Sequence, residues 1–60
     1  MLLKIEETFE LAVRKHQKND IKEAQELYNQ VLKINPNHSQ ALNNLGVIFK
    51  TLGEKQKAKE

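Results

Sequence analysis

The sequence has 60 residues, 30% of them charged, and its ten basic and eight acidic side chains leave a net charge of +2. A chain this short buries only about 60% of its unfolded surface, so it forms one domain at most, with a marginal core. The absence of cysteine excludes disulfides, thiol chemistry and zinc sites built on cysteine pairs.

The first residues show no targeting or membrane-spanning pattern. Only Met1, Leu2 and Leu3 precede Lys4, and two glutamates follow soon after, so no apolar run is long enough for a signal peptide or a membrane span. We therefore expect a cytoplasmic protein with no membrane partner. Because basic and acidic residues are interleaved except in the lysine-rich tail 55–60, which we interpret as a solvated helix face, we also expect no nucleic-acid partner.

A first helix is predicted from about residue 4 to residue 18. Apolar side chains recur there at spacings of three and four residues, as on the buried face of an amphipathic helix. They are Ile5, Phe9, Ala12 and Val13. The pair Asn19-Asp20 then breaks the pattern and predicts a turn.

A second helix is predicted to begin at Asp20. Asp20 and Glu23 have the spacing of a capping box, in which each side chain accepts a hydrogen bond from a free backbone N–H. Pro36 excludes the α conformation at Asn35 and therefore ends this helix. The apolar stripe between these limits consists of Ile21, Ala24, Leu27, Tyr28, Val31 and Ile34.

A third helix follows Pro36, with Asn37 as its predicted N-cap in a pair with Gln40 and Gly53 as its predicted end. Its apolar face consists of Ala41, Leu42, Leu45, Ile48, Phe49 and Leu52. Residues 54–60 favour a helix but are too few to hold one without a neighbour. Because short connections make neighbouring helices antiparallel, we predict an all-α fold of antiparallel helix-turn-helix repeats, with three helices and a short C-terminal helical segment.

The chain repeats itself after 34 residues, since Leu11-Ala12 aligns with Leu45-Gly46. In this register it resembles the tetratricopeptide repeat family, whose unit of about 34 residues contains a Leu-Gly pair, an aromatic residue, an alanine in the second helix and a closing proline. The first unit matches at Leu11-Ala12, Ala24, Tyr28 and Pro36, and the second at Leu45-Gly46, Phe49 and Ala58. Thr8 and Lys15 depart from the pattern, because the family prefers a large apolar and an aromatic residue there.

The resemblance implies an α-solenoid fragment. Residues 1–60 would form a single set of units, in which 5–38 is a complete repeat and 39–60 a truncated one. We expect the large residues Leu11, Tyr28, Leu45 and Phe49 to fill the space between helices. The small residues Ala12 and Gly46 on the first helix of each unit, and Ala24 and Ala58 on the second, would let the helices approach closely.

The resemblance also implies a protein-interaction module and not an enzyme, with no cofactor and with a protein or peptide as its partner. In the family, the first helix of each hairpin lines a concave groove that holds extended peptides. The residues that this places on the groove are Phe9, Glu10, Val13, His16, Gln17, Asn43, Asn44, Val47 and Lys50. Asn44 stands where the family often has a peptide-contacting asparagine, whereas Asn43 alone is interpreted as a solvated polar residue.

Other ligands and chemistries are disfavoured by the residues present. Phe9 and Val13 occupy positions where relatives that clamp a chaperone carboxylate need a lysine and an asparagine. His16 and His38 have no cysteine or paired carboxylate at a ligand spacing, so we interpret them as exposed surface histidines and expect no metal. The GxxxxGK pattern of a phosphate-binding loop is absent.

The truncated second unit predicts self-association. A solenoid normally needs about three repeats, so we expect the chain to be the leading piece of a longer array and to form a homodimer. The residues expected to be exposed for this contact are Leu45, Ile48, Phe49 and Leu52. Two copies could pack simply, or the third helix could run straight through Gly53 onto a partner chain.

Two alternative functions stay open. The repeats could be the recognition arm of a larger enzyme, because similar arrays precede glycosyltransferase domains. An RNA-binding helical repeat is the other alternative, and it is less favoured because such repeats usually lack the combination of a Leu-Gly pair with Pro36.

Overall fold

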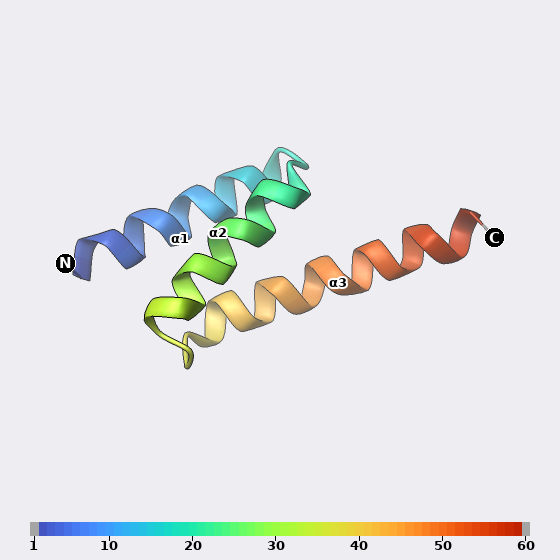
Figure 1. The fold of residues 1–60 in the computed structure, drawn as a ribbon. Coiled ribbons are helices and arrows are strands. Elements are labelled where there is room, and N and C mark those ends of the chain that lie inside the picture. The colour runs from blue at the N-terminus through green and yellow to red at the C-terminus, as the bar shows by residue number, and fades with distance from the viewer. Residues whose placement is uncertain (1, 60) are drawn as a thin grey trace.

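The protein folds into three helices. The computed structural model describes the backbone of residues 2–59 and the side chains of residues 4–54. Helix α1 spans Leu2–Gln17, α2 spans Ile21–Ile34 and α3 spans Ser39–Lys59, and this described part of the chain contains no strand. Figure 1 shows α1 and α2 as an antiparallel pair, with α3 packed against α2 and extending beyond it. The predicted all-α fold of antiparallel helices is confirmed.

The turn between α1 and α2 is closed by backbone hydrogen bonds. The N–H of Asn19 donates to the carbonyl of His16 (3.0 Å), and the N–H of Asp20 donates to that of Lys15 (2.8 Å). Asn19 has a positive φ of 69°, a conformation that asparagine tolerates better than most residues. The turn is therefore a Schellman-type C-cap, and it lies where the Asn19-Asp20 pair predicted a break.

The predicted capping box at the start of α2 is wrong. Asp20 is the N-cap residue, but its side chain makes no capping hydrogen bond. Its backbone N–H, which the Glu23 carboxylate would need, is already donated to the carbonyl of Lys15. Glu23 pairs instead with the Lys15 ammonium at 3.0 Å, and this hydrogen bond raises the pKa of Lys15.

The turn between α2 and α3 is organised by its own side chains. Asn35 is extended (φ −135°, ψ 92°), as a residue before proline must be, and its Oδ1 accepts a hydrogen bond from the N–H of Asn37 (3.1 Å). The N-cap of α3 is His38, whose Nδ1 accepts from the N–H of Ala41 (3.1 Å). The prediction of Asn37 as the N-cap is therefore wrong by one residue, because the turn continues to His38, whose N–H donates to the Asn35 carbonyl (3.1 Å).

Helix α3 continues through Gly53, so the predicted end of the helix there is wrong. A glycine C-cap needs a left-handed backbone, and no glycine among the described residues has a positive φ. One glycine inside a helix costs only about 1 kcal/mol, so the helix-forming residues that follow can carry α3 on to Lys59. The side chains of 55–60, including the expected packing residue Ala58, lie outside the described residues.

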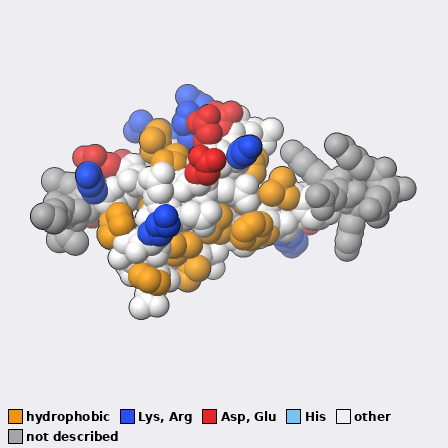
Figure 2. Space-filling model, in the orientation of Figure 1, with side chains coloured by type: hydrophobic (Ala, Val, Ile, Leu, Met, Phe, Trp, Pro, Cys, Tyr) orange, Lys and Arg blue, Asp and Glu red, His pale blue; other side chains and the backbone are white. Residues whose placement is uncertain are grey.

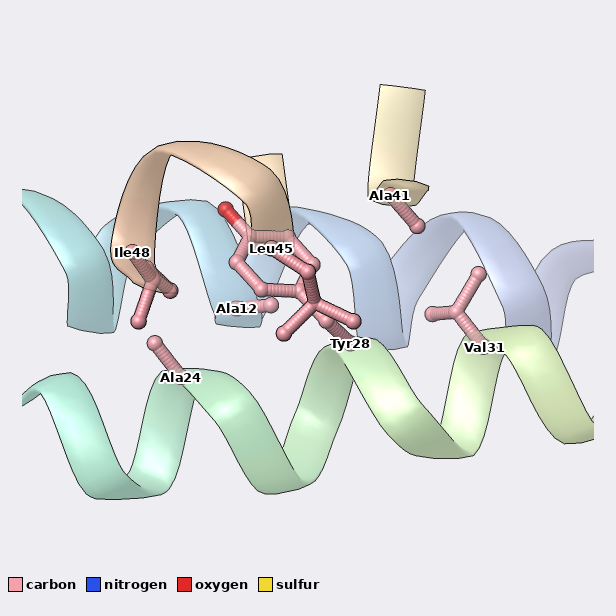
Figure 3. Packing of buried hydrophobic residues seen from close by; sticks show 7 residues of the cluster. All are labelled: Ala12, Ala24, Tyr28, Val31, Ala41, Leu45 and Ile48. Atoms are coloured by element: carbon pink, nitrogen blue, oxygen red, sulfur yellow. The ribbon is translucent and has the colours of Figure 1, made fainter. Parts of the chain in front are cut away.

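The core lies where the three helices meet, and Tyr28 is its largest side chain (Figure 3). Its buried residues are Ala12 from α1, Ala24, Tyr28 and Val31 from α2, and Ala41, Leu45 and Ile48 from α3. Small and large side chains alternate across these contacts, which lets the helices pack closely. The alanines at Ala12 and Ala24 are buried, as expected for positions of close approach.

Helix α3 has two apolar stripes, offset from each other by one residue. The stripe that packs toward α2 contains Ala41, Leu45, Ile48 and Leu52, of which Leu52 is half-buried. The second stripe contains Leu42, Gly46, Phe49 and Gly53. The expectation that Leu45 and Ile48 are exposed is therefore wrong, because α2 covers the first stripe, whereas Phe49 is 59% exposed as predicted.

Equivalent residues of the two units differ in burial because their neighbours differ. Leu45 is covered by α2, whereas Leu11 is 43% exposed because no preceding helix covers it within the described residues. Ala12 packs in the core, whereas a Cβ built at Gly46 would meet no described atom within 4 Å. The predictions that Leu11 and Phe49 fill space between helices and that Gly46 permits a close approach are thus wrong within the described chain.

Candidate functional site

The predicted groove residues come from α1 and α3, which meet at Tyr28 of α2. On α1, the half-buried residues are Phe9, Val13 and His16, and the exposed ones are Glu10 and Gln17. On α3, Asn44 is half-buried and Asn43, Val47 and Lys50 are exposed. The structure brings His16 and Asn44 together at Tyr28, and it leaves Asn43 and Lys50 in solvent.

A row of hydrogen bonds joins α1 to α3 through the Tyr28 hydroxyl. Asn44 donates from Nδ2 to Tyr28 Oη at 3.2 Å, and Tyr28 Oη lies 3.5 Å from His16 Nδ1. The Asn44 amide nitrogen can only donate, so the Tyr28 hydroxyl accepts that bond and keeps its own proton to donate; in the tautomer with the imidazole proton on Nε2, His16 Nδ1 accepts it. In that tautomer, Asn44 Oδ1 is an acceptor on one side of the hydroxyl and His16 Nε2–H is a donor on the other.

Tyr28 has two roles, of which the sequence predicted only the first. It was placed in the core, and it is fully buried there, but its hydroxyl also orients the two polar side chains beside it. Figure 3 shows the ring rising from α2 between α1 and α3. A lone tyrosine in an otherwise apolar stripe was the available signal, because a buried hydroxyl requires a partner.

The Tyr28 hydroxyl should ionise at a higher pH in the folded protein than in the unfolded chain. Burial raises its pKa, and the hydrogen bond from Asn44 lowers it by a smaller amount. The folded state therefore holds the phenol proton more tightly, so this contribution to stability is fully present below about pH 10 and is lost as the pH rises through the folded-state pKa. The tyrosinate ultraviolet absorbance measures this directly, because the chain has one tyrosine.

A titration in urea is the control for this pKa prediction. In urea the ionisation should return to the ordinary tyrosine value of about 10. Superimposable titrations of the folded and unfolded chain would contradict the prediction.

An aromatic cluster extends the site along α1. The ring of Phe9 lies 5.9 Å from that of Tyr28 and 4.9 Å from the imidazole of His38, centroid to centroid. Beside it is an open hollow of about 390 Å³, lined by Phe9, Glu10, Val13 and Arg14. The sequence analysis did not name Arg14, which the structure places on this hollow.

Both histidines have structural contacts, which corrects their interpretation as exposed surface residues. His16 is half-buried and its ring packs edge-on to Tyr28 at 6.2 Å, and His38 caps α3 and packs on Phe9. In the part of the chain that the structure describes, no three His, Cys, Asp or Glu side chains are grouped as metal ligands would be. Within the same part, no helix is long and apolar enough to cross a membrane.

The helical hairpin of α1 and α2 and the additional helix α3 packed on α2 define an α-helical repeat protein. A family model described as TPR repeat matches residues 14–53, two thirds of the chain, and the chain therefore belongs to the tetratricopeptide repeat family. Repeats of this family are generally protein–protein interaction modules and are typically not catalytic. Neither the comparison with curated proteins nor that with solved structures gave a match.

Proposed function

We propose that this chain binds an extended segment of a partner protein along the face between α1 and α3. The observation that carries the proposal is the hydrogen-bonded row His16–Tyr28–Asn44, in which the Tyr28 hydroxyl contacts both the His16 imidazole of α1 and the Asn44 amide of α3. An extended peptide presents backbone N–H and C=O groups, which are complementary to Asn44 Oδ1 and His16 Nε2–H.

The residues around the row His16–Tyr28–Asn44 suit a peptide with both apolar and charged side chains. Val47 is 52% exposed on α3, and Phe9 and Val13 border the hollow on α1, so apolar side chains of the ligand would have surfaces to cover. Glu10 and Arg14 on the rim of the hollow supply one charge of each sign. Fixing Asn44 through Tyr28 reduces the side-chain entropy that binding would otherwise remove.

The test is a displayed library of random peptides, selected on the immobilised chain, followed by affinity measurements on the selected peptides. Asn44→Ala should weaken binding by several-fold to about tenfold, the effect of one backbone hydrogen bond. Val47→Glu should also weaken peptide binding, because it removes apolar surface from α3. It leaves the hydrogen bonds of Tyr28 unchanged. Phe49→Ala is the matched control, since Phe49 is similarly exposed but lies on the second stripe of α3, which contains neither Asn44 nor Val47.

The proposal is contradicted if no peptide is enriched above background. It is equally contradicted if the selected peptides bind Asn44→Ala and Val47→Glu as tightly as the original chain.

We also propose that the chain self-associates as a homodimer through α3. Of the residues first assigned to that contact, Phe49 is exposed and remains available for it, whereas Leu52 is half-buried and packs against the core. Leu45 and Ile48 are withdrawn, because they lie in the core of the monomer.

A further inference from the structure

The first turn of α3 is held by the imidazole of His38. A helix begins with backbone N–H groups that have no partner within the helix, and an N-cap side chain accepts a hydrogen bond from one of them. Here His38 Nδ1 accepts from the N–H of Ala41 at 3.1 Å. Within the described residues no other side chain accepts a hydrogen bond from this turn, which contains no acidic residue.

Histidine differs from the usual N-cap residues because protonation removes its acceptor. Serine, threonine, aspartate and asparagine keep an oxygen acceptor at neutral and mildly acidic pH. An imidazole accepts at Nδ1 only in the neutral tautomer with its proton on Nε2, and both nitrogens of the imidazolium are donors. The hydrogen bond from Ala41 therefore requires a neutral His38.

The ring of His38 also joins α3 to α1. Its centroid lies 4.9 Å from that of Phe9, with the two planes tilted by 40°, and His38 is half-buried. Because an aromatic face attracts a cation, this contact alone would favour the charged ring. Two effects of similar size oppose it, namely the loss of the cap and the repulsion of a cation by the positive end of the helix dipole. Protonation of His38 is therefore unfavourable for the folded first turn.

The charged groups on the elements packed around His38 do not reverse this balance. Glu6 and Glu10 flank Phe9 on α1, and Lys33 lies in the last turn of α2. All three are exposed, so water and salt screen their charges. The first two turns of α3 contain no charged residue, and Figure 2 shows most charged side chains in that view over α1 and α2. The protonation state of His38 itself therefore decides whether the cap forms.

His16, the other histidine, is placed differently. It lies in the last turn of α1 with Arg14 and Lys15, where the negative end of the helix dipole favours a cation. Its Nδ1 is 3.5 Å from the Tyr28 hydroxyl, a long distance for a hydrogen bond, and that hydroxyl also accepts a hydrogen bond from Asn44. A charge on His16 should therefore cost the fold little.

We propose that His38 is an acid-sensitive N-cap, which closes the first turn of α3 while its imidazole is neutral and releases that turn on protonation. The unfolded chain takes up a proton on this imidazole near the ordinary histidine value of about 6.5, whereas the capped fold does not. The unfolded state thus binds more protons on acidification. The stability that the cap supplies is therefore present above about pH 6.5 and is lost as the pH falls below it.

Urea unfolding of the full chain, followed by circular dichroism at about pH 7.5 and about pH 5.5, tests this switch on either side of the ordinary histidine value. The folding equilibrium constant should fall about 2- to 30-fold at the lower pH, which is the effect of losing one N-cap. His38→Asn supplies an N-cap that does not titrate. This variant should be about as stable as the original chain at the higher pH and should lose most of the pH dependence.

Two control variants separate the cap from other titrating groups. His16→Gln removes the other histidine and should retain the pH dependence. His38→Ala removes the cap at every pH, so it should already show the lower stability at the higher pH. If His38→Ala does not fold, the Ala41 amide of the original chain gives the same information by nuclear magnetic resonance. Its protection from hydrogen exchange should fall as His38 becomes protonated.

Equal stability of the original chain at the two pH values would overturn the proposal. So would a His38→Asn variant that keeps the full pH dependence, because another group would then be responsible for it. An Ala41 amide whose protection stays constant while His38 titrates would overturn the proposal as well. None of these results affects the peptide-binding proposal, which is tested at one pH on Asn44 and Val47.

Discussion

Replacing Ile48 with alanine is expected to lower the free energy of unfolding by about 2–5 kcal/mol. Ile48 is fully buried in the core shared by α2 and α3, so its loss removes apolar burial and leaves a cavity. A domain of this size rarely has more than about 3–5 kcal/mol of net stability, and Ile48→Ala should therefore be largely unfolded. Urea titrations followed by circular dichroism measure the change.

Phe49→Ala is the control at the adjacent position. Phe49 is larger than Ile48 but 59% exposed, so its replacement should change the free energy of unfolding by no more than about 0.5 kcal/mol at concentrations where the chain is monomeric. Equal losses at the two positions would mean that α3 packs on α2 through the other stripe, and the description of the core would be wrong.

Replacing Tyr28 with alanine should be the most damaging single change, at about 3–5 kcal/mol. Tyr28 is the largest fully buried side chain among the described residues, and it packs between all three helices (Figure 3). Its removal opens a cavity and also deprives Asn44 and His16 of their shared partner. Thermal unfolding by circular dichroism should show loss of the cooperative transition.

Tyr28→Phe separates the ring from the hydroxyl. It keeps the packing and removes one buried hydrogen-bonding group, so the loss should be about 0.5–1.5 kcal/mol. Combined with Asn44→Ala, the two changes should be less than additive, because they remove the same hydrogen bond. If the two changes in the free energy of unfolding are strictly additive, the Asn44–Tyr28 contact contributes no coupling energy. The orienting role assigned to Tyr28 would then be wrong.

Tyr28 also links the stability of the fold to the proposed binding face. The same side chain fills the core and, through its hydroxyl, holds Asn44 and His16. We therefore expect Tyr28→Phe to weaken peptide binding more than its modest effect on stability would suggest, since Asn44 would lose its fixed orientation.

The sequence by itself determined the three helices and the places where they turn. Helix formation is governed by local periodicity and by residues such as Asn19 and Pro36 that restrict the backbone, so these features can be read from a short window. The period of 34 residues likewise identified the repeat family. Tyr28 and Asn44 were both singled out, although not as partners.

Only the tertiary structure decided how these local features are used. The first apolar stripe of α3 is covered because α2 reaches Leu45 and Ile48, although the second stripe, one residue away, also carries large apolar side chains at Leu42 and Phe49. The backbone N–H of Asp20 donates to the carbonyl of Lys15, so the capping box does not form. Gly53 is helical, because its backbone does not adopt the left-handed conformation that would end the helix. Burial and hydrogen-bond partners depend on which element lies opposite, and a helical period alone contains no information about that neighbour.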